Sequence, residues 1–126
     1  MQVERVDFVS VLTQDVARAK RFYGETLGLP IESEGGSDVE FTLGQVTLDV
    51  FDPSSIGEPF APSPAGIAIR VPDVTAARAD LETKGVEFDG EIVHTSVCDM
   101  TFFKDPDGNA LILHRRFAPF PDGRTP

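Results

Sequence analysis

The chain has 126 residues, of which 40% are hydrophobic and 25% are charged, a composition typical of a globular domain that builds its own core. The formal net charge of −10 repels phosphate backbones, which argues against nucleic-acid binding and favours neutral or cationic partners. No apolar run is long enough to cross a bilayer, and the charged amino-terminal segment does not resemble a signal peptide. Because Cys98 is the single cysteine, no internal disulfide can form, and we expect a reducing, cytoplasmic location.

The first predicted elements are a strand over residues 6–12, VDFVSVL, and a helix that begins after Asp15. The helix shows apolar residues at helical spacing, with Asp15 as its N-cap and Gly28 at its left-handed end. Two β-rich runs follow, DVEFTL at 38–43 and VTLDVF at 46–51, and the Gly-Gln pair between them predicts a two-residue hairpin turn.

The second half of the chain repeats this order. A strand-like run, GIAIRV, precedes a helix that begins after Asp73 and ends near Gly85. Two further β-rich runs, VCDMTFF and ALILH, flank the turn Asp-Pro-Asp-Gly-Asn at residues 105–109. The order strand, helix and β-rich runs thus occurs twice, and we assign each half the order βαβββ, with two of the three strands after each helix located in the sequence.

The repeat defines the expected organisation of the chain. Residues 1–51 form the first module and residues 66–118 the second. Residues 52–65 contain four prolines and are expected to link the two modules, and residues 119–126 form a carboxy-terminal tail.

The doubled order, the D-V-x-x-A-x-x-F-Y start of the first helix, the L-G-L after it and the F-x-D-P-D-G-N hairpin resemble the vicinal oxygen chelate superfamily. This superfamily includes glyoxalase I, extradiol dioxygenases, fosfomycin-resistance enzymes and bleomycin-binding proteins. The resemblance covers residues 3–118 and implies an α+β fold of two tandem βαβββ modules, whose curved mixed sheets surround a cleft, and a homodimer. Whether each cleft forms within one chain or across two stays open.

The resemblance also implies where a divalent ion such as Zn, Ni, Mn or Fe is held in the superfamily's metal enzymes, with one ligand from each of four strands. Three of these positions fall on Phe8, Gly66 and Ile112, which carry no side-chain donor, and only the position near Asp49 keeps an oxygen. A first-row ion needs three or four protein donors. We therefore expect that the usual metal site is lost and that the protein uses no cofactor.

Alternation along the strands predicts which side chains line the cleft. The candidates are mostly apolar with a few polar groups, as in other small-molecule pockets. They are Phe8, Ser10, Glu40, Thr47, Asp49, Phe51, Gly66, Ala68, Arg70, Cys98, Met100, Phe102, Ile112 and His114.

The polar candidates allow more than one interpretation. The Gly-Gln turn places Glu40 directly opposite Asp49, which is destabilising unless solvent, a proton or a cationic ligand relieves it. His114 is either a half-exposed strand-end residue or a cleft residue that serves as hydrogen-bond partner, base or metal ligand with Glu40 and Asp49. Arg70 pairs either with an anionic ligand or with an acidic neighbour, and His94 is expected on the surface.

Two functions from different classes follow. The first is a metal-free small-molecule-binding protein that sequesters an antibiotic, or an aromatic or cationic metabolite, in an apolar cleft. The alternative is an enzyme, a glyoxalase-like lyase or isomerase or a dioxygenase, that has a non-standard metal site or uses metal-independent acid/base chemistry by His114, Glu40 or Asp49. A purely structural dimer has no supporting feature.

Overall fold

The structure is a computed structural model that describes residues 1–126. The chain folds into two compact units. Unit 1 comprises residues 1–64 and 105–109, and unit 2 comprises residues 65–104 and 110–126. The turn at residues 105–109 thus belongs to unit 1, whereas the strands that it connects belong to unit 2. The module boundaries predicted above follow the βαβββ repeat rather than compactness, and they stay predictions.

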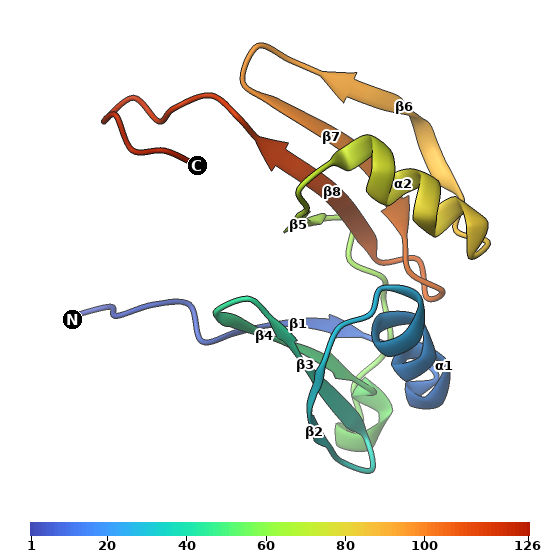
Figure 1. The fold of residues 1–126 in the computed structure, drawn as a ribbon. Helices are drawn as coiled ribbons and strands as arrows, with labels where there is room; N and C mark the ends of the chain where they lie inside the picture. Colours follow the sequence, from blue (N-terminus) through green and yellow to red (C-terminus); the bar gives the residue numbers. More distant parts are fainter. The chain divides into compact units, whose positions relative to one another are not determined.

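Unit 1 contains the first βαβββ repeat (Figure 1). Its elements are β1 (Phe8–Leu12), α1 (Val16–Arg21), the π-helical turn η1 (Phe22–Thr26), β2 (Ile31–Glu34), β3 (Asp38–Leu43), β4 (Val46–Phe51) and the 3-10 helix η2 (Pro53–Ile56). The strands form a mixed sheet, sheet A, in the order β1-β4-β3-β2, with β1 parallel to β4 and the other pairs antiparallel. The predicted N-cap is confirmed, since the Asp15 carboxylate accepts a 2.9 Å hydrogen bond from the Arg18 amide.

One face of sheet A is buried beneath α1 and η1. Val39 and Phe41 on β3 and Leu48 and Val50 on β4 have at most 1% of their surface exposed, and Tyr23 of η1 is fully buried among them. The other face of the sheet carries half-buried and exposed residues. This burial pattern has the period of two that strands require, so it assigns each side chain of β3 and β4 to one face.

Unit 2 contains the second repeat. Its elements are β5 (Ile67–Arg70), α2 (Val74–Thr83), β6 (Phe88–His94), β7 (Cys98–Lys104) and β8 (Ala110–Arg116). They form sheet B in the order β5-β8-β7-β6, with β5 parallel to β8. Helix α2 is capped as predicted, because the Asp73 carboxylate accepts a 2.9 Å hydrogen bond from the Ala76 amide. Leu111, Leu113 and Phe103 form the buried side of the sheet.

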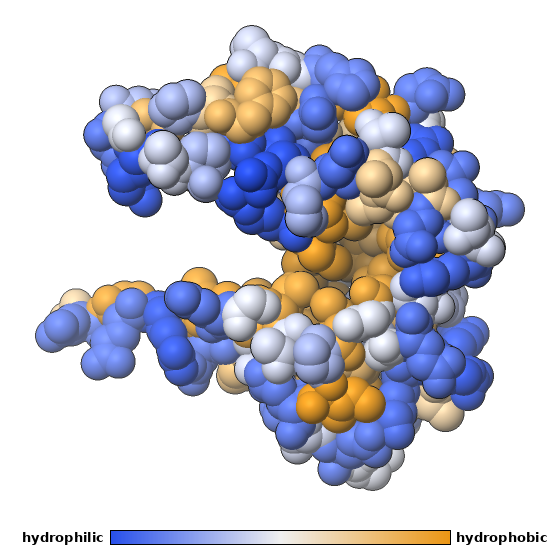
Figure 2. Space-filling view, in the orientation of Figure 1, coloured by the Kyte–Doolittle hydropathy of each residue, from blue (hydrophilic) through white to orange (hydrophobic).

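The α+β fold of two βαβββ modules, each with a four-stranded mixed sheet, is confirmed. Residues 1–7 precede β1 without regular structure and carry the exposed side chains of Val3 and Val6. Figure 2 shows the hydrophobic side chains of this segment interspersed with hydrophilic ones. None of the helices has the length and apolar character needed to span a membrane.

Candidate functional site

The outward face of sheet A, opposite its core, brings together the predicted residues of the first module. On β4, Leu48 and Val50 are fully buried in the core, whereas Thr47, Asp49 and Phe51 are half-buried on the outward face. The alternation used to choose these residues is therefore present in the structure. That they contact a ligand stays a prediction.

Strand β1 adds two more predicted residues to the outward face of sheet A. Its parallel pairing with β4 places Phe8 beside Thr47 and Ser10 beside Asp49. Phe8 has 60% of its surface exposed, a large exposed fraction for an aromatic residue in a strand. It is available for contact with another molecule.

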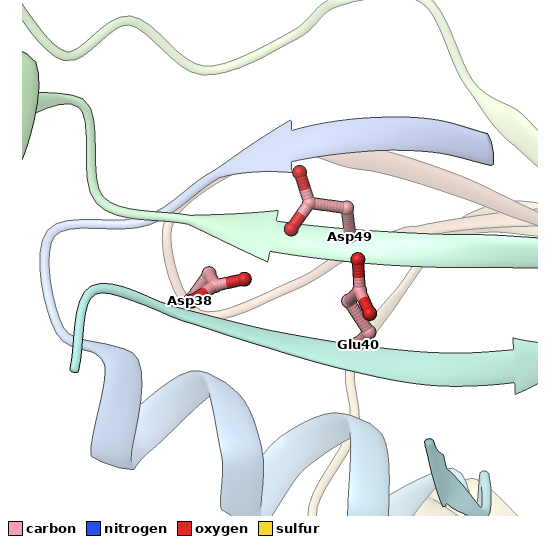
Figure 3. A group of neighbouring side chains, drawn as sticks. All are labelled: Asp38, Glu40 and Asp49. Carbon is pink, nitrogen blue, oxygen red and sulfur yellow. The ribbon is translucent and has the colours of Figure 1, made fainter. Parts of the chain in front are cut away.

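Three carboxylates gather on this face. The predicted register is confirmed, with Glu40 of β3 directly opposite Asp49 of β4, and Asp38 of β3 joins them. One oxygen from each of the three carboxylates lies within 4.8 Å of the others (Figure 3). Asp38 was missed by the sequence analysis, although it stands two residues before Glu40 and so shares its face.

Asp49 is the electrostatically strained member of this acidic group. Its Oδ2 accepts a 3.0 Å hydrogen bond from the Ser10 hydroxyl, whereas its Oδ1 is buried without a partner. Burial raises the pKa of the Asp49 carboxyl, the Ser10 hydrogen bond opposes this, and the charge of Asp38 raises it further. A cation placed against the group would relieve both the desolvation and the repulsion.

A shallow cavity of about 360 Å³ lies on unit 1 next to this group, and Phe8 and Glu40 line it. Glu32 also lines it and is held in place by hydrogen bonds from the hydroxyls of Thr42, at 3.0 Å, and Thr47, at 2.8 Å. The remaining lining residues are Arg5, Asp7, Gly44, Gln45, Val46 and Thr47. This cavity is more polar than the apolar cleft that the sequence predicted, since charged and amide side chains form much of its wall.

In unit 2 the predicted residues likewise share one face of sheet B. The register places Ala68 of β5 beside Ile112 of β8, which is opposite Phe102 of β7. One step along the strands it places Arg70, His114 and Met100 in a second row. Ala68 and Arg70 are exposed and the other four are half-buried. Cys98 lies further along this face of β7 and is buried, as the interpretation of a small apolar group predicted.

The positions to which the superfamily resemblance assigns metal ligands do not fit an ion here. A Cβ atom on Gly66 would lie 2.9 Å from both Cδ1 and Cγ1 of Ile112, so hydrocarbon fills the space that a ligating side chain at residue 66 would enter. Phe8 has no donor atom, which leaves Asp49 alone of the four positions. One carboxylate cannot replace the three or four donors that hold a first-row ion.

The three remaining polar candidates are Arg70, His114 and His94. Arg70 is exposed and makes no ion pair in the structure, so the predicted pairing with an acidic neighbour is absent. His114 is half-buried and belongs to unit 2, and the acidic group of unit 1 consists of Asp38, Glu40 and Asp49 without it. His94 lies on the surface as expected, with its Nδ1 2.7 Å from the Asp99 carboxylate.

The turn at residues 105–109 does more than reverse the chain. Asp105 accepts a 2.6 Å hydrogen bond from the Tyr23 hydroxyl, and Asp107 accepts hydrogen bonds from Thr13 at 2.6 Å and Arg18 at 2.7 Å. Asn109 donates to the Leu12 carbonyl at 2.8 Å. These polar side chains are buried scaffold within unit 1 and are not part of the candidate site.

Comparison with known proteins agrees with this architecture. The family profile described as Glyoxalase/Bleomycin resistance protein/Dioxygenase superfamily matches residues 5–113. The uncharacterized protein YaeR of Escherichia coli (strain K12) is 29% identical to this chain, and the match covers 90% of this chain and 98% of YaeR.

Two solved structures illustrate the range of the fold. TnmS3, an antibiotic binding protein from Streptomyces sp. CB03234, is 29% identical with a TM-score of 0.77, over 92% of this chain and 98% of that chain. Lactoylglutathione lyase from Agrobacterium tumefaciens has a TM-score of 0.76 over 90% of this chain and 94% of that chain, but at 18% identity it shows the fold alone. The same architecture thus serves a binding protein and an enzyme.

Proposed function

This chain belongs to the glyoxalase/bleomycin resistance protein/dioxygenase superfamily, and on that premise we propose that it is a small-molecule-binding protein that works without a metal ion. The observation that carries the proposal is the contact between Gly66 and Ile112. It replaces two of the four metal-ligand positions by packed hydrocarbon, while Phe8 occupies a third.

The proposed ligand is an antibiotic, or an aromatic or cationic metabolite. The likeness to TnmS3, an antibiotic binding protein, supports this class. The exposed Phe8 ring beside the carboxylates of Glu40 and Asp49 supports an aromatic compound with a cationic group, because the ring face and the carboxylates both attract positive charge. The net charge of −10 favours the approach of such a compound.

We further infer a homodimer, as the superfamily resemblance predicts, and a cytoplasmic location. Cys98 supports the location, because it is a free, buried thiol and the single cysteine of the chain. Light scattering across a range of protein concentrations would test the dimer, and a constant monomer mass would contradict it.

Thermal unfolding with a panel of cationic glycopeptides, quinones and other aromatic natural products tests the binding function. A ligand that binds the folded state alone stabilises it by about 2.7 kcal/mol when present at 100 times its Kd. We expect at least one aromatic cation to raise the Tm of the metal-free protein. An unchanged Tm across the whole panel would overturn the proposal.

Matched variants separate the site from general electrostatics. Glu40→Gln and Asp49→Asn each remove one charge from the acidic group, whereas Glu58→Gln removes one charge from an exposed position of unit 1 that makes no ion pair. The first two variants should weaken binding of the cationic ligand, and Glu58→Gln should leave it unchanged. An equal loss in all three would mean that net charge alone attracts the ligand.

The alternative is an enzyme with a relocated metal ion, and the acidic group favours it, since Asp38, Glu40 and Asp49 offer three oxygen ligands close together. Metal analysis of the purified protein distinguishes the two functions. Near-stoichiometric Mn, Fe, Ni or Zn that is lost in the Asp49→Asn variant would favour the enzyme over the metal-free binding protein.

A further inference from the structure

Three of the four strands of sheet B present a surface whose charge is opposite to that of the protein as a whole. On β5, β8 and β7, the residues that face the same side as Ile112 include no carboxylate, although the chain carries 21 acidic side chains. Three of them are cationic: Arg70 on β5, Lys104 on β7 and Arg116 on β8. We call this the basic face of sheet B. The corresponding face of sheet A carries the acidic group of Asp38, Glu40 and Asp49.

Arg70 and Lys104 are the two cations on the basic face that are exposed and make no ion pair, and Arg70 is the one whose strand neighbour is His114. The Arg70 side chain is exposed and makes no ion pair, and its neighbour on β8, His114, makes no side-chain hydrogen bond. The nearest strand position on the far side of His114 is Met100, which is apolar. An arginine without a carboxylate partner retains its full set of donors for an anion, in the fork geometry that suits a carboxylate.

Arg116 contributes charge rather than a direct contact. Its guanidinium carbon lies 4.4 Å from the centre of the Phe120 ring, and its Nη2 donates a 2.9 Å hydrogen bond to the Pro119 carbonyl. Its Nε is buried without a partner, so solvent and ligands do not reach that atom. The carboxy-terminal tail therefore holds Arg116 in place, where its positive charge reinforces that of the face.

An apolar surface adjoins Arg70 and His114. In the next row along the strands, Ala68, Ile112 and Phe102 lie side by side, and the latter two are half-buried. Asp89 of β6 is paired with Phe102 at the far end of this row and is separated from Ala68 by two strands. A flat apolar group laid on this row would have one end beside Arg70 on β5 and away from Asp89, whereas Arg116 lies four residues along β8 from Ile112.

We propose that the basic face of sheet B binds the anionic group of an amphipathic ligand, a carboxylate on a flat aromatic body, with Arg70 as the specificity-determining residue. This inference rests on the proposed small-molecule-binding function and concerns aromatic ligands that carry a carboxylate, which sheet B would bind separately from the cationic group assigned to the acidic group of sheet A. Arg70 and His114 donate hydrogen bonds to the carboxylate, and Ile112 and Phe102 contact the aromatic body. A protein of net charge −10 binds such an anion only at a place where its own carboxylates are absent.

Three naphthalene probes of the same shape test the inference by isothermal titration calorimetry at pH 7. They are 2-naphthoate, which is anionic, 2-naphthamide, which is neutral, and 2-naphthylmethylamine, which is cationic. We expect 2-naphthoate to bind at least about tenfold more tightly than 2-naphthamide, because a hydrogen-bonded charge contributes on that scale. Since Arg70 is exposed, added salt should reduce this preference.

The variants use a matched pair of arginines. Arg70→Gln should cost 2-naphthoate about tenfold in affinity and leave 2-naphthamide unchanged. Arg115→Gln is the control, because Arg115 is also on sheet B and carries the same charge but faces the opposite side of β8, in register with Asp99. It should leave both affinities unchanged. Arg70→Lys should keep part of the preference for the anion, and equal Tm values would establish that all variants are folded.

Equal binding of 2-naphthoate and 2-naphthamide would overturn the inference while leaving the binding function in place. An Arg115→Gln loss as large as that of Arg70→Gln would overturn it as well, because the effect would then be one of net charge. If none of the three probes binds, the inference is wrong, whereas the proposed function stands or falls separately with the panel of antibiotics and aromatic cations.

Discussion

The Tyr23 hydroxyl donates a 2.6 Å hydrogen bond to Oδ2 of Asp105, although 82 residues separate them in the chain. The same carboxylate accepts hydrogen bonds on Oδ1 from the amides of Asp107 and Asn109, both at 2.9 Å, and on Oδ2 from the Asn109 side chain at 2.8 Å. Burial and then the charge of Asp105 raise the pKa of the Tyr23 phenol, so the phenol stays protonated and remains a donor.

Tyr23→Phe should therefore destabilise the protein. It removes one of the donors that satisfy a buried carboxylate, and such a loss costs about 1–3 kcal/mol. Urea unfolding at pH 7 measures the difference. Ser55→Ala, which removes an exposed hydrogen bond to the Asp52 carbonyl, is the control and should stay within about 0.5 kcal/mol of the wild type. A Tyr23→Phe variant as stable as the control would contradict this account of the turn.

Asp107 provides a second test of the same turn. Its side chain is 1% exposed and accepts hydrogen bonds from the Gln14 amide and from the side chains of Thr13 and Arg18. In Asp107→Asn, the NH2 group of the new side chain would face these donors in place of an accepting oxygen. We expect a loss of at least about 2 kcal/mol. The matched control is Asp7→Asn, which breaks an arginine pair whose carboxylate is 77% exposed and should cost less than about 1 kcal/mol. Comparable losses in the two variants would show that burial is not what gives Asp107 its importance.

Local rules explain what could be predicted from the sequence. The caps at Asp15 and Asp73 and the pairing of Glu40 with Asp49 each depend on a few neighbouring residues, and the structure contains all of them. Strands β2 and β6 were not located, because nearly all their residues are exposed and no apolar alternation marks them.

Contacts between distant residues explain what could not be predicted. The sequence predicts only a chain reversal at residues 105–109, because nothing in the turn itself identifies Tyr23 or Thr13 as partners. The packing of Ile112 into the space beside Gly66 was likewise invisible, although both residues had been singled out as lost metal ligands. The Oδ1 atom of Asp49 has no hydrogen-bond partner because it is buried. The alternation of residues along a strand indicates which face a side chain is on, but it does not give the extent of its burial.

The contact between Gly66 and Ile112 can be measured by a double-mutant cycle. Gly66→Ala places a Cβ 2.9 Å from Ile112 and should destabilise the protein by about 1–3 kcal/mol through overpacking. In an Ile112→Ala background the same change should cost less, which gives a coupling energy of about 0.5 kcal/mol or more. Gly36→Ala is the control, since nothing lies within 4 Å of its Cβ position. Additive effects in the cycle would mean that Ile112 does not fill the space beside residue 66.

Asp49 predicts a pH dependence of stability with a definite sign. Its pKa in the folded protein is raised above the ordinary value of 3.8, so in the window just above 3.8 the folded state binds more protons than the unfolded state. The contribution of this group to the free energy of unfolding is therefore largest below pH 3.8. It decreases as the pH rises through the pKa that the group has in the folded protein. Asp49→Asn keeps an oxygen acceptor for Ser10 and has no such loss. The Tm of the variant minus that of the wild type should be near zero at pH 3 and positive at pH 7.

Asp122 gives the opposite case, because hydrogen bonds from Arg124 lower the pKa of its exposed carboxyl. The difference for Asp122→Asn should be small and should become more negative as the pH rises. A difference for Asp49→Asn that is flat or decreasing between pH 3 and pH 7 would show that the carboxylate is already satisfied in the free protein, and that it does not need a cationic partner.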